Sequence, residues 1–374
     1  MTSLVDDRLA RLRACLAEAP FDAVVLTAPE SVHYATGYRS VSAQVFPGFP
    51  LAAVVTGDTV VLVAPAAETG PAIAGGFPAD DIVPFGRFYF TGDGPAAAMS
   101  DRHADRDEAL AVALDRIGTP GHLGVEGNAT AVEGIDATAW MLGVRAVKLP
   151  GEQALLRRSA EIAETAIEAA FAMARPGVTE RELADRIAAT MAAAGGMPRF
   201  VVASSGVRSA LADSFPTSTP LAEGDLVRLD IGCVYDGYWS DIARTAVLGE
   251  PTALHLSRYE ALLAGVRAEF DTARPGATAG EVFAAGQGTV EASGLAPYRR
   301  HHVGHAIGMA VYERPIIAPG DPTVLVPGMV FSFETPFYEL GWGGMMIEDT
   351  GVVTETGFTL FTSLDSALRP LPVG

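Results

Sequence analysis

Residues 226–248, LVRLDIGCVYDGYWSDIARTAVL, decide the fold class of this chain. Two apolar runs of β type meet at Asp236-Gly237, a dipeptide typical of a two-residue hairpin turn. A hairpin centred on this turn places Asp241 opposite Gly232, two residues from Asp230 on the same face. The two carboxylates are then diagonal neighbours with Cα atoms about 7–8 Å apart, from where they can converge on a metal. In the alternative, one aspartate is hydrogen-bonded and the other faces solvent.

A second acidic hairpin is expected in residues 328–354, GMVFSFETPFYELGWGGMMIEDTGVVT. Glu334 and Glu348 are equidistant from Gly341, so a hairpin in register makes them direct partners with Cβ atoms about 5 Å apart. Both follow apolar runs, and we expect both to be largely buried. Opposed like charges destabilise a sheet, and a cation between them is the simplest remedy. In the alternative, one of the two glutamates is exposed.

Histidines cluster in residues 301–308, HHVGHAIG, where three of the seven histidines fall within five residues. Gly304 and Gly308 allow backbone to approach a crowded site closely. A neutral imidazole is a borderline ligand that completes a carboxylate-rich site, and we select His305 for this role. In the alternative, the histidine is structural.

Four carboxylates and one imidazole suit two divalent cations. The predicted metal ligands are Asp230, Asp241, His305, Glu334 and Glu348. Oxygen-rich ligation favours Mn²⁺, with Co²⁺, Fe²⁺ or Zn²⁺ as alternatives. Paired metals polarise a carbonyl and supply hydroxide near neutral pH. The sequence has no glycine-rich phosphate loop and no serine nucleophile elbow, so it predicts a metal-dependent hydrolase.

An internal repeat indicates how these hairpins arose. Residues 174–182 (ARPGVTERE) match residues 273–281 (ARPGATAGE), 99 positions later, and each copy contains a Thr-x-x-Glu capping box after a helical pattern. A glycine also precedes Asp230 and Glu334 by six residues each. The ordered matches predict two copies of helix–helix–strand, and hence an α+β, pseudo-twofold duplicated catalytic domain over residues 151–374.

The first 150 residues follow a different pattern. Short β-branched runs alternate with helical patterns, which predicts an α/β N-terminal domain over residues 1–150. We expect strands at residues 22–27, 51–56 and 59–63, and helices at residues 9–17, 103–116 and 129–142.

Composition limits the partners and the compartment. The 374 residues carry a formal net charge of -19, which disfavours nucleic acid and anionic membranes as partners. Cys15 and Cys233 are the only cysteines, which excludes a disulfide framework and fits a reducing cytoplasm. The first 20 residues predict an amphipathic helix rather than a signal peptide, and no stretch is long and apolar enough to span a bilayer. We therefore expect neither nucleic acid nor a membrane as a partner.

These motifs resemble the pita-bread metallopeptidase family, which includes methionine aminopeptidase, aminopeptidase P, prolidase and creatinase. The matching motifs are LDIG around Asp230, YWSDIART around Asp241, HHVGHAIG around His305, GMVFSFETP around Glu334 and MIEDTGVVTETG around Glu348. The N-terminal stretch RLARLRACL…FDAVVLTAPESVHYATGY resembles the N-terminal domain of the prolidase–creatinase branch.

The resemblance implies a role for each ligand and an assembly. Asp230 would chelate one metal, Asp241 and Glu348 would bridge both, and His305 and Glu334 would bind the other. Glu334 would also serve as general base for the bridging water. Enzymes of this family are usually cytoplasmic homodimers, so the resemblance implies the same here.

Three positions depart from the family's proline peptidases. Those enzymes carry two histidines and often an arginine where this chain has Asp213, Tyr312 and Met346, while His301 matches a family active-site histidine. By position, the substrate-binding candidates are therefore Asp213, His301, Tyr312 and Met346, and the catalytic candidates are Glu334, His301 and Tyr312. Tyr312 could donate a hydrogen bond to an oxyanion. Asp213 would favour a cationic or donor-rich part of a substrate.

The resemblance therefore implies an Xaa-Pro dipeptidase or an aminopeptidase P-like enzyme that hydrolyses a C–N bond with metal-activated water. The three departures keep a second reading open, a creatinase-like or ectoine hydrolase-like enzyme acting on a non-peptide C–N bond of a small metabolite. A lyase or a metal-free binding protein on the same scaffold is the third.

Overall fold

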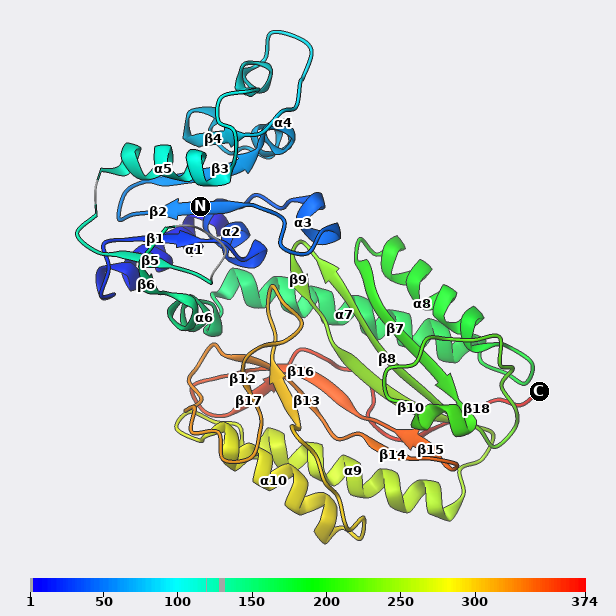
Figure 1. Cartoon of the computed structure of the whole chain (residues 1–374). Helices are drawn as coiled ribbons and strands as arrows, with labels where there is room; N and C mark the ends of the chain where they lie inside the picture. The colour runs from blue at the N-terminus through cyan, green and yellow to red at the C-terminus, as the bar shows by residue number, and fades with distance from the viewer. Residues whose placement is uncertain (1–2, 119, 128–131) are drawn as a thin grey trace. The chain divides into compact units, whose positions relative to one another are not determined.

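The computed structural model describes residues 3–118, 120–127 and 132–374, and the chain forms two compact units, Met1–Arg145 and Ala146–Gly374 (Figure 1). Each unit has a sheet of its own. Within the described ranges, the structure contains no helix with the length and apolar character that crossing a membrane requires.

The first unit is built on a six-stranded sheet in the order β4-β3-β2-β1-β5-β6. β1, β2 and β3 pair antiparallel, while β1 with β5 and β3 with β4 pair parallel, which confirms a mixed α/β unit. The strands are β1 (Ala23–Leu26), β2 (Ala52–Val55), β3 (Val60–Pro65), β4 (Ile82–Phe85), β5 (Leu123–Val125) and β6 (Ile135–Asp136). The helices are α1 (Leu4–Ala17), α2 (Pro29–Thr36), α3 (Val41–Val45), α4 (Ala66–Ala74), α5 (Arg106–Ile117) and α6 (Thr138–Ala146), with short 3-10 turns η1 (Ala79–Asp81) and η2 (Pro95–Met99).

One predicted helix of this unit is wrong in part. Of residues 129–142, the first three lie outside the described residues, and Ile135–Asp136 form strand β6 beside β5. The backbone of Gly134 approaches Leu123 so closely that a Cβ at this position would lie 2.6 Å from the Leu123 carbonyl oxygen. Helix α6 begins only at Thr138, whose N–H donates to Asp136 Oδ1 at 2.9 Å. Pairing with a strand has overridden the helical pattern here.

The second unit contains a curved sheet whose central path runs β12-β11-β13-β16-β10-β8-β7 (Figure 1). Its strands are β7 (Met197–Ser205), β8 (Leu226–Tyr235), β9 (Tyr238–Trp239), β10 (Ile242–Leu248), β11 (Gly304–Ala306), β12 (Glu313–Ile316), β13 (Val330–Glu334), β16 (Glu348–Val353), β17 (Phe358–Leu360) and β18 (Arg369–Leu371). β14 (Phe337–Glu339) and β15 (Gly343–Met345) form a separate ribbon. The helices are α7 (Pro150–Met173), α8 (Glu180–Ala193), α9 (Ala253–Thr272) and α10 (Ala279–Ala292), and η3 (Gly206–Ala210) is a 3-10 turn.

The predicted duplication is visible in the backbone contacts. Thr179 and Thr278 each cap a helix through a reciprocal bond with the glutamate three residues later. Thr179 also bridges to Pro220, and Thr278 bridges in the same way to Val324. The two halves meet at the centre of the sheet, where β10 pairs antiparallel with β16. The second unit is therefore the predicted pseudo-twofold α+β domain.

Sheet register brings the predicted ligands to one face. A single row crosses four strands through Asp230 of β8, Ala243 of β10, Glu348 of β16 and Glu334 of β13. Laterally paired residues point to the same face, as do residues two apart along a strand. Asp241 lies two residues before Ala243, and His305 pairs with Ser332, two residues before Glu334. All five predicted ligands therefore share one face of the sheet.

The opposite face packs on the helices. Phe331 and Phe333 alternate with the ligand row and join a buried core with residues of α9 and α10. Cys233 also points this way, because Ser159 of α7 donates to its carbonyl at 3.2 Å and lies 3.6 Å from its Sγ. Cys233 therefore faces away from the acidic site.

Candidate metal centre

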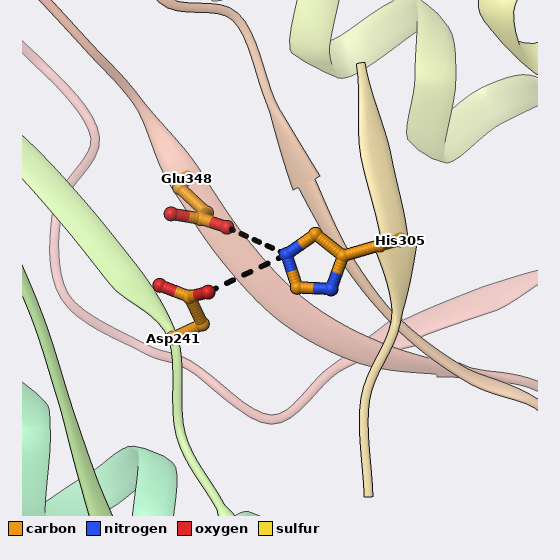
Figure 2. Close-up of side chains that lie close together, drawn as sticks. All are labelled: Asp241, His305 and Glu348. Atoms are coloured by element: carbon orange, nitrogen blue, oxygen red, sulfur yellow. Dashed lines mark ion pairs between the residues drawn. The ribbon is translucent and has the colours of Figure 1, made fainter. Parts of the chain in front are cut away.

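Three predicted ligands form the tightest cluster. The ligand atoms of Asp241, His305 and Glu348 all lie within 4.8 Å of one another (Figure 2). His305 Nε2 is 3.4 Å from Asp241 Oδ2 and 3.9 Å from Glu348 Oε1. All three side chains are buried, and they come from both halves of the duplicated unit.

The other two predicted ligands stand beside this cluster. Asp230 and Glu334 line the same cavity as Asp241 and Glu348. Asp230 Oδ2 lies 3.5 Å from Nη1 of Arg228. Glu334 Oε1 lies 3.1 Å from Nδ1 of His302 and 3.6 Å from Nη2 of Arg300. Each of these outer carboxylates thus has the guanidinium group of an arginine as its neighbour.

Crowding of carboxylates changes how the site ionises. Burial raises the pKa of Asp230 and of Glu348 well above the ordinary values, and Asp241 raises both further. Burial raises the pKa of Glu334 to about 6, although Arg300 opposes the shift. Burial lowers the pKa of His305, but the carboxylates of Asp241 and Glu334 outweigh this effect, so that its net pKa is raised. A cation among these groups would favour their charged forms.

The donor set fits divalent metals. His305 Nε2 and Glu348 Oε1 are enclosed, and no described residue completes a hydrogen bond with either atom. His305 Nδ1 lies 3.1 Å from the carbonyl oxygen of Ala306. When Nδ1 donates to that carbonyl, the lone pair of Nε2 faces two carboxylates, an arrangement that a bound cation would stabilise. Carboxylates with one imidazole are a suitable set for hard or borderline divalent ions.

Side chains other than the predicted ligands hold the seam between the two halves. Arg244 Nη1 donates to the carbonyl oxygen of Glu348 at 2.8 Å, and its Nη2 donates to Asp349 Oδ1 at 2.6 Å. Thr350 Oγ1 donates to the carbonyl oxygen of Asp241 at 3.0 Å. Because the backbone ladder between β10 and β16 is a single pair, these bonds fix the two metal-side strands to each other.

A cavity of about 570 Å³ opens above the carboxylates. Asp213, Tyr312 and Met346, three of the expected substrate residues, line it. The ring of Tyr312 stacks on the ring of His305 with centroids 3.8 Å apart, and Tyr312 is 53% exposed. The rest of the lining is largely apolar, with residues 200–202 of β7 and residues 214–216 among it. A substrate in this cavity would lie directly against the acidic floor.

His301 and His302 occupy different environments. His301 is exposed and is not among the residues lining the cavity. His302 is buried beside Glu334, and burial together with its neighbour His301 lowers its pKa to about 3, so it is neutral. The sequence singled out His301 and missed His302. Strand β11 begins only at Gly304, so no strand alternation could assign the side of either residue.

A buried ion pair shapes the loop before Tyr312. Lys148, the single lysine of the sequence, lies 2.8 Å from Glu313, and both side chains are almost fully enclosed. Glu313 Oε1 accepts the N–H of Met309 at 3.2 Å and that of Ala310 at 3.4 Å. The pair therefore fixes the loop that leads from His305 to Tyr312.

Comparison with known proteins identifies the family of this chain. The family model described as "Metallopeptidase family M24" matches residues 154–355, more than half of the chain. The chain belongs to metallopeptidase family M24. The M24 domain follows a match to the "Creatinase/Prolidase N-terminal domain" over residues 8–147. The predicted resemblance to the prolidase–creatinase branch is confirmed, and family membership implies a site for divalent metal.

Proteins similar to this chain include peptidases. The Xaa-Pro dipeptidase of Lactobacillus delbrueckii subsp. lactis is 34% identical over 64% of this chain, and the match spans 66% of that relative, just under two thirds of its length. The structure of the Xaa-Pro dipeptidase from Bacillus anthracis superposes with a TM-score of 0.81 at 26% identity, over 98% of this chain and 100% of that one. The structure of the prolidase from Pyrococcus furiosus superposes with a TM-score of 0.77 at 28% identity, over 94% of this chain and 99% of that one. These similarities support a metal-dependent peptidase function.

Proposed function

We propose that this chain is a metal-dependent peptidase that hydrolyses the C–N bond after the first residue of an Xaa-Pro peptide, as a dipeptidase or an aminopeptidase P-like enzyme. The observation that carries the proposal is that carboxylates from two duplicated hairpins line a single cavity and that two of them meet one enclosed imidazole. The names of the similar proteins point to the substrate class. The cavity volume suits a small peptide.

We assign the metal to five ligands: Asp230, Asp241, His305, Glu334 and Glu348. We further propose two ions, with Mn²⁺ first and Co²⁺, Fe²⁺ or Zn²⁺ as alternatives. The oxygen-rich donor set, which contains no thiolate, supports this choice. Bound there, divalent ions would supply hydroxide near neutral pH and polarise the scissile carbonyl.

The chain's own groups would handle protons and orientation. Glu334 faces the cavity and, as general base, would take the proton of the attacking water. The hydroxyl of Tyr312 would donate a hydrogen bond to the carbonyl oxygen of the substrate as negative charge develops there. Burial raises the pKa of this hydroxyl, which keeps it protonated. Asp213 and Met346 would contact the substrate. His301 remains a catalytic and substrate-binding candidate on the resemblance alone.

An activity screen tests the proposal. The protein is purified, its metal content is measured, and the Mn²⁺ form is assayed with Gly-Pro, Xaa-Pro-Yaa peptides, creatine and ectoine. We expect Xaa-Pro hydrolysis that is lost in Glu334→Gln. Turnover of creatine or ectoine without peptide hydrolysis would establish the non-peptide C–N hydrolase instead. A protein that binds no metal and hydrolyses none of these would exclude a metallohydrolase.

We also propose a homodimer in a reducing cytoplasm. The two cysteines, Cys15 and Cys233, are free thiols, which supports such a compartment. Light scattering of the purified protein tests the dimer, and a monomer at micromolar concentration would contradict it.

A further inference from the structure

Arg228 is an enclosed arginine beside the metal site. Strand β8 carries it two residues before Asp230, so both side chains leave the same face of the sheet. The side chain of Arg228 is 0% exposed. A guanidinium without water must find its partners in the protein, so those partners indicate what the residue holds together.

Most donors of Arg228 bind one short piece of backbone. Nε donates to the carbonyl oxygen of Ser209 at 2.9 Å, and Nη2 donates to those of Leu211 at 2.8 Å and Ala212 at 2.6 Å. The chain then enters residues 213–216, all of which line the cavity, and we call these four residues the wall segment. Arg228 therefore fixes the backbone from which the wall segment departs.

The remaining contacts of Arg228 point to the metal side. Nη1 lies 3.5 Å from Asp230 Oδ2. The guanidinium carbon lies 5.2 Å from the ring centroid of Tyr338, whose hydroxyl lies 3.7 Å from Sδ of Met346 in the cavity lining. One rigid, planar group thus contacts both the carboxylate of Asp230 and the carbonyls that precede the wall segment.

We propose that Arg228 is a positioning residue that joins Asp230 to the wall segment, so that metal binding at Asp230 and ordering of the wall segment favour each other. The inference rests on the proposed role of Asp230 as a metal ligand. Groups that hydrogen-bond a ligating carboxylate fix its orientation and tune metal affinity. Because the coupling is between two binding or ordering equilibria, it acts equally in both directions.

A second arginine provides a matched control. Arg208 Nη2 donates to the carbonyl oxygen of Phe215 at 3.1 Å, and its Nε lies 3.1 Å from Glu180. Arg208 therefore anchors the wall segment without the contact to Asp230 that Arg228 makes. Substituting Arg208 loosens the same segment but leaves the carboxylate of Asp230 in place.

Two measurements on the full-length protein test whether Arg228 links Asp230 to the wall segment, which we call the link. Mn²⁺ is titrated by calorimetry into the wild type, Arg228→Met, Arg228→Lys, Arg208→Met and Asp230→Asn. We expect Arg228→Met to weaken Mn²⁺ binding about 10–100-fold, as loss of a group behind a metal ligand does. Arg228→Lys, which keeps the charge but not the planar fork, should fall between this variant and the wild type. Arg208→Met loosens the wall segment but keeps the contact of Arg228 to Asp230, so it should weaken Mn²⁺ binding less than Arg228→Met does. Hydrogen exchange should show that Mn²⁺ protects the amides of residues 211–215 in the wild type but not in either Arg228 variant.

Each of the other possible outcomes refutes a defined part of the proposal. Equal weakening by Arg228→Met and Arg208→Met would reduce Arg228 to an anchor of the segment and refute the link. Weakening by Asp230→Asn with unchanged Arg228 variants would refute the link alone, whereas unchanged Mn²⁺ binding in Asp230→Asn would refute the proposed ligand set and the link with it. Where Arg228→Met does not fold, Arg228→Lys decides: retained Mn²⁺ protection of residues 211–215 refutes the link, and its loss in a folded variant supports it.

Discussion

Glu334 and Glu348 are direct cross-strand partners in the antiparallel pair β13–β16, and both are buried. Opposed carboxylates in a dry sheet require a proton or a cation between them. Burial and neighbouring acids raise the pKa of both groups, to about 6 for Glu334. Without metal, protons therefore compete for the positions that a divalent ion would occupy.

Metal binding is accordingly expected to release protons. Ligating carboxylates must be deprotonated, so Mn²⁺ affinity should fall as pH decreases from 7 toward 5, through the pKa of Glu334. The raised pKa values of Asp230 and Glu348 act in the same direction. Calorimetric titration in two buffers with different ionisation enthalpies gives the number of protons released. An apparent binding enthalpy that is the same in both buffers near pH 6 would contradict this expectation.

Tyr312→Phe separates stacking from hydrogen bonding. The phenylalanine ring can still stack on His305, as Tyr312 does at 3.8 Å between centroids, but it cannot donate to a developing oxyanion. We expect kcat to fall about 10²–10³-fold, as for loss of one oxyanion donor, with a small change in KM and in Mn²⁺ affinity. Steady-state kinetics on an Xaa-Pro substrate measure this. An unchanged kcat would remove Tyr312 from the catalytic candidates.

The buried pair Lys148–Glu313 should be costly to break. Lys148→Met removes the ammonium group that lies beside the buried carboxylate of Glu313 and should lower the free energy of unfolding by about 3–5 kcal/mol. Adding Glu313→Gln to Lys148→Met should recover part of this loss, because the buried negative charge is then gone. Urea denaturation of the two variants and the wild type gives these values. Equal stability of Lys148→Met and the wild type would contradict the prediction.

Glu269 of α9 is fully buried, and no described residue hydrogen-bonds either oxygen of its carboxyl group. Burial raises its pKa well above 4.5, so the folded protein holds a proton that the unfolded chain releases above that pH. The stability contributed by this neutral carboxyl group is present in full below pH 4.5 and is lost as pH rises toward the folded-state pKa.

Glu269→Gln should remove this pH dependence. Relative to the variant, the wild type should lose up to about 1.4 kcal/mol of unfolding free energy per pH unit above pH 4.5, until the folded-state pKa is reached. Urea denaturation between pH 5 and 8 measures the difference. Glu260→Gln, at an exposed position of the same helix, is the control: its free energy of unfolding should change with pH as that of the wild type does. A difference between wild type and Glu269→Gln that stays constant with pH would show that Glu269 is already ionised in the fold.

Both hairpin registers were predictable because local signals fix them. Asp236-Gly237 adopts positive φ at both positions, as the predicted two-residue turn requires, and Ile242 pairs with Ile231 as a turn centred there demands. The direct pairing of Glu334 with Glu348 followed from their equal distance to Gly341. Where one face of a strand is buried, a shift by one residue would bury the wrong side chains, so sequence determines register strongly.

The surroundings of the ligands were less predictable. Arg228 is a charged residue in an apolar run, and its partners are backbone carbonyls 16 to 19 positions earlier in the chain, which no periodicity specifies. His302 lies in an irregular segment, where no repeating angle relates one side chain to the next. The helix predicted at residues 129–142 is wrong around β6 because a short strand at a sheet edge depends on its neighbour rather than on its own sequence.

The enclosed position of Lys148 has a practical consequence at the bench. It is the single lysine of the chain, and its ammonium group lies against Glu313 with almost no solvent contact. Dyes, biotin esters and cross-linkers that couple to lysine side chains will therefore find no accessible target in the native molecule. A preparation that takes up such a reagent at Lys148 contains opened molecules, and the extent of coupling at this residue measures their fraction.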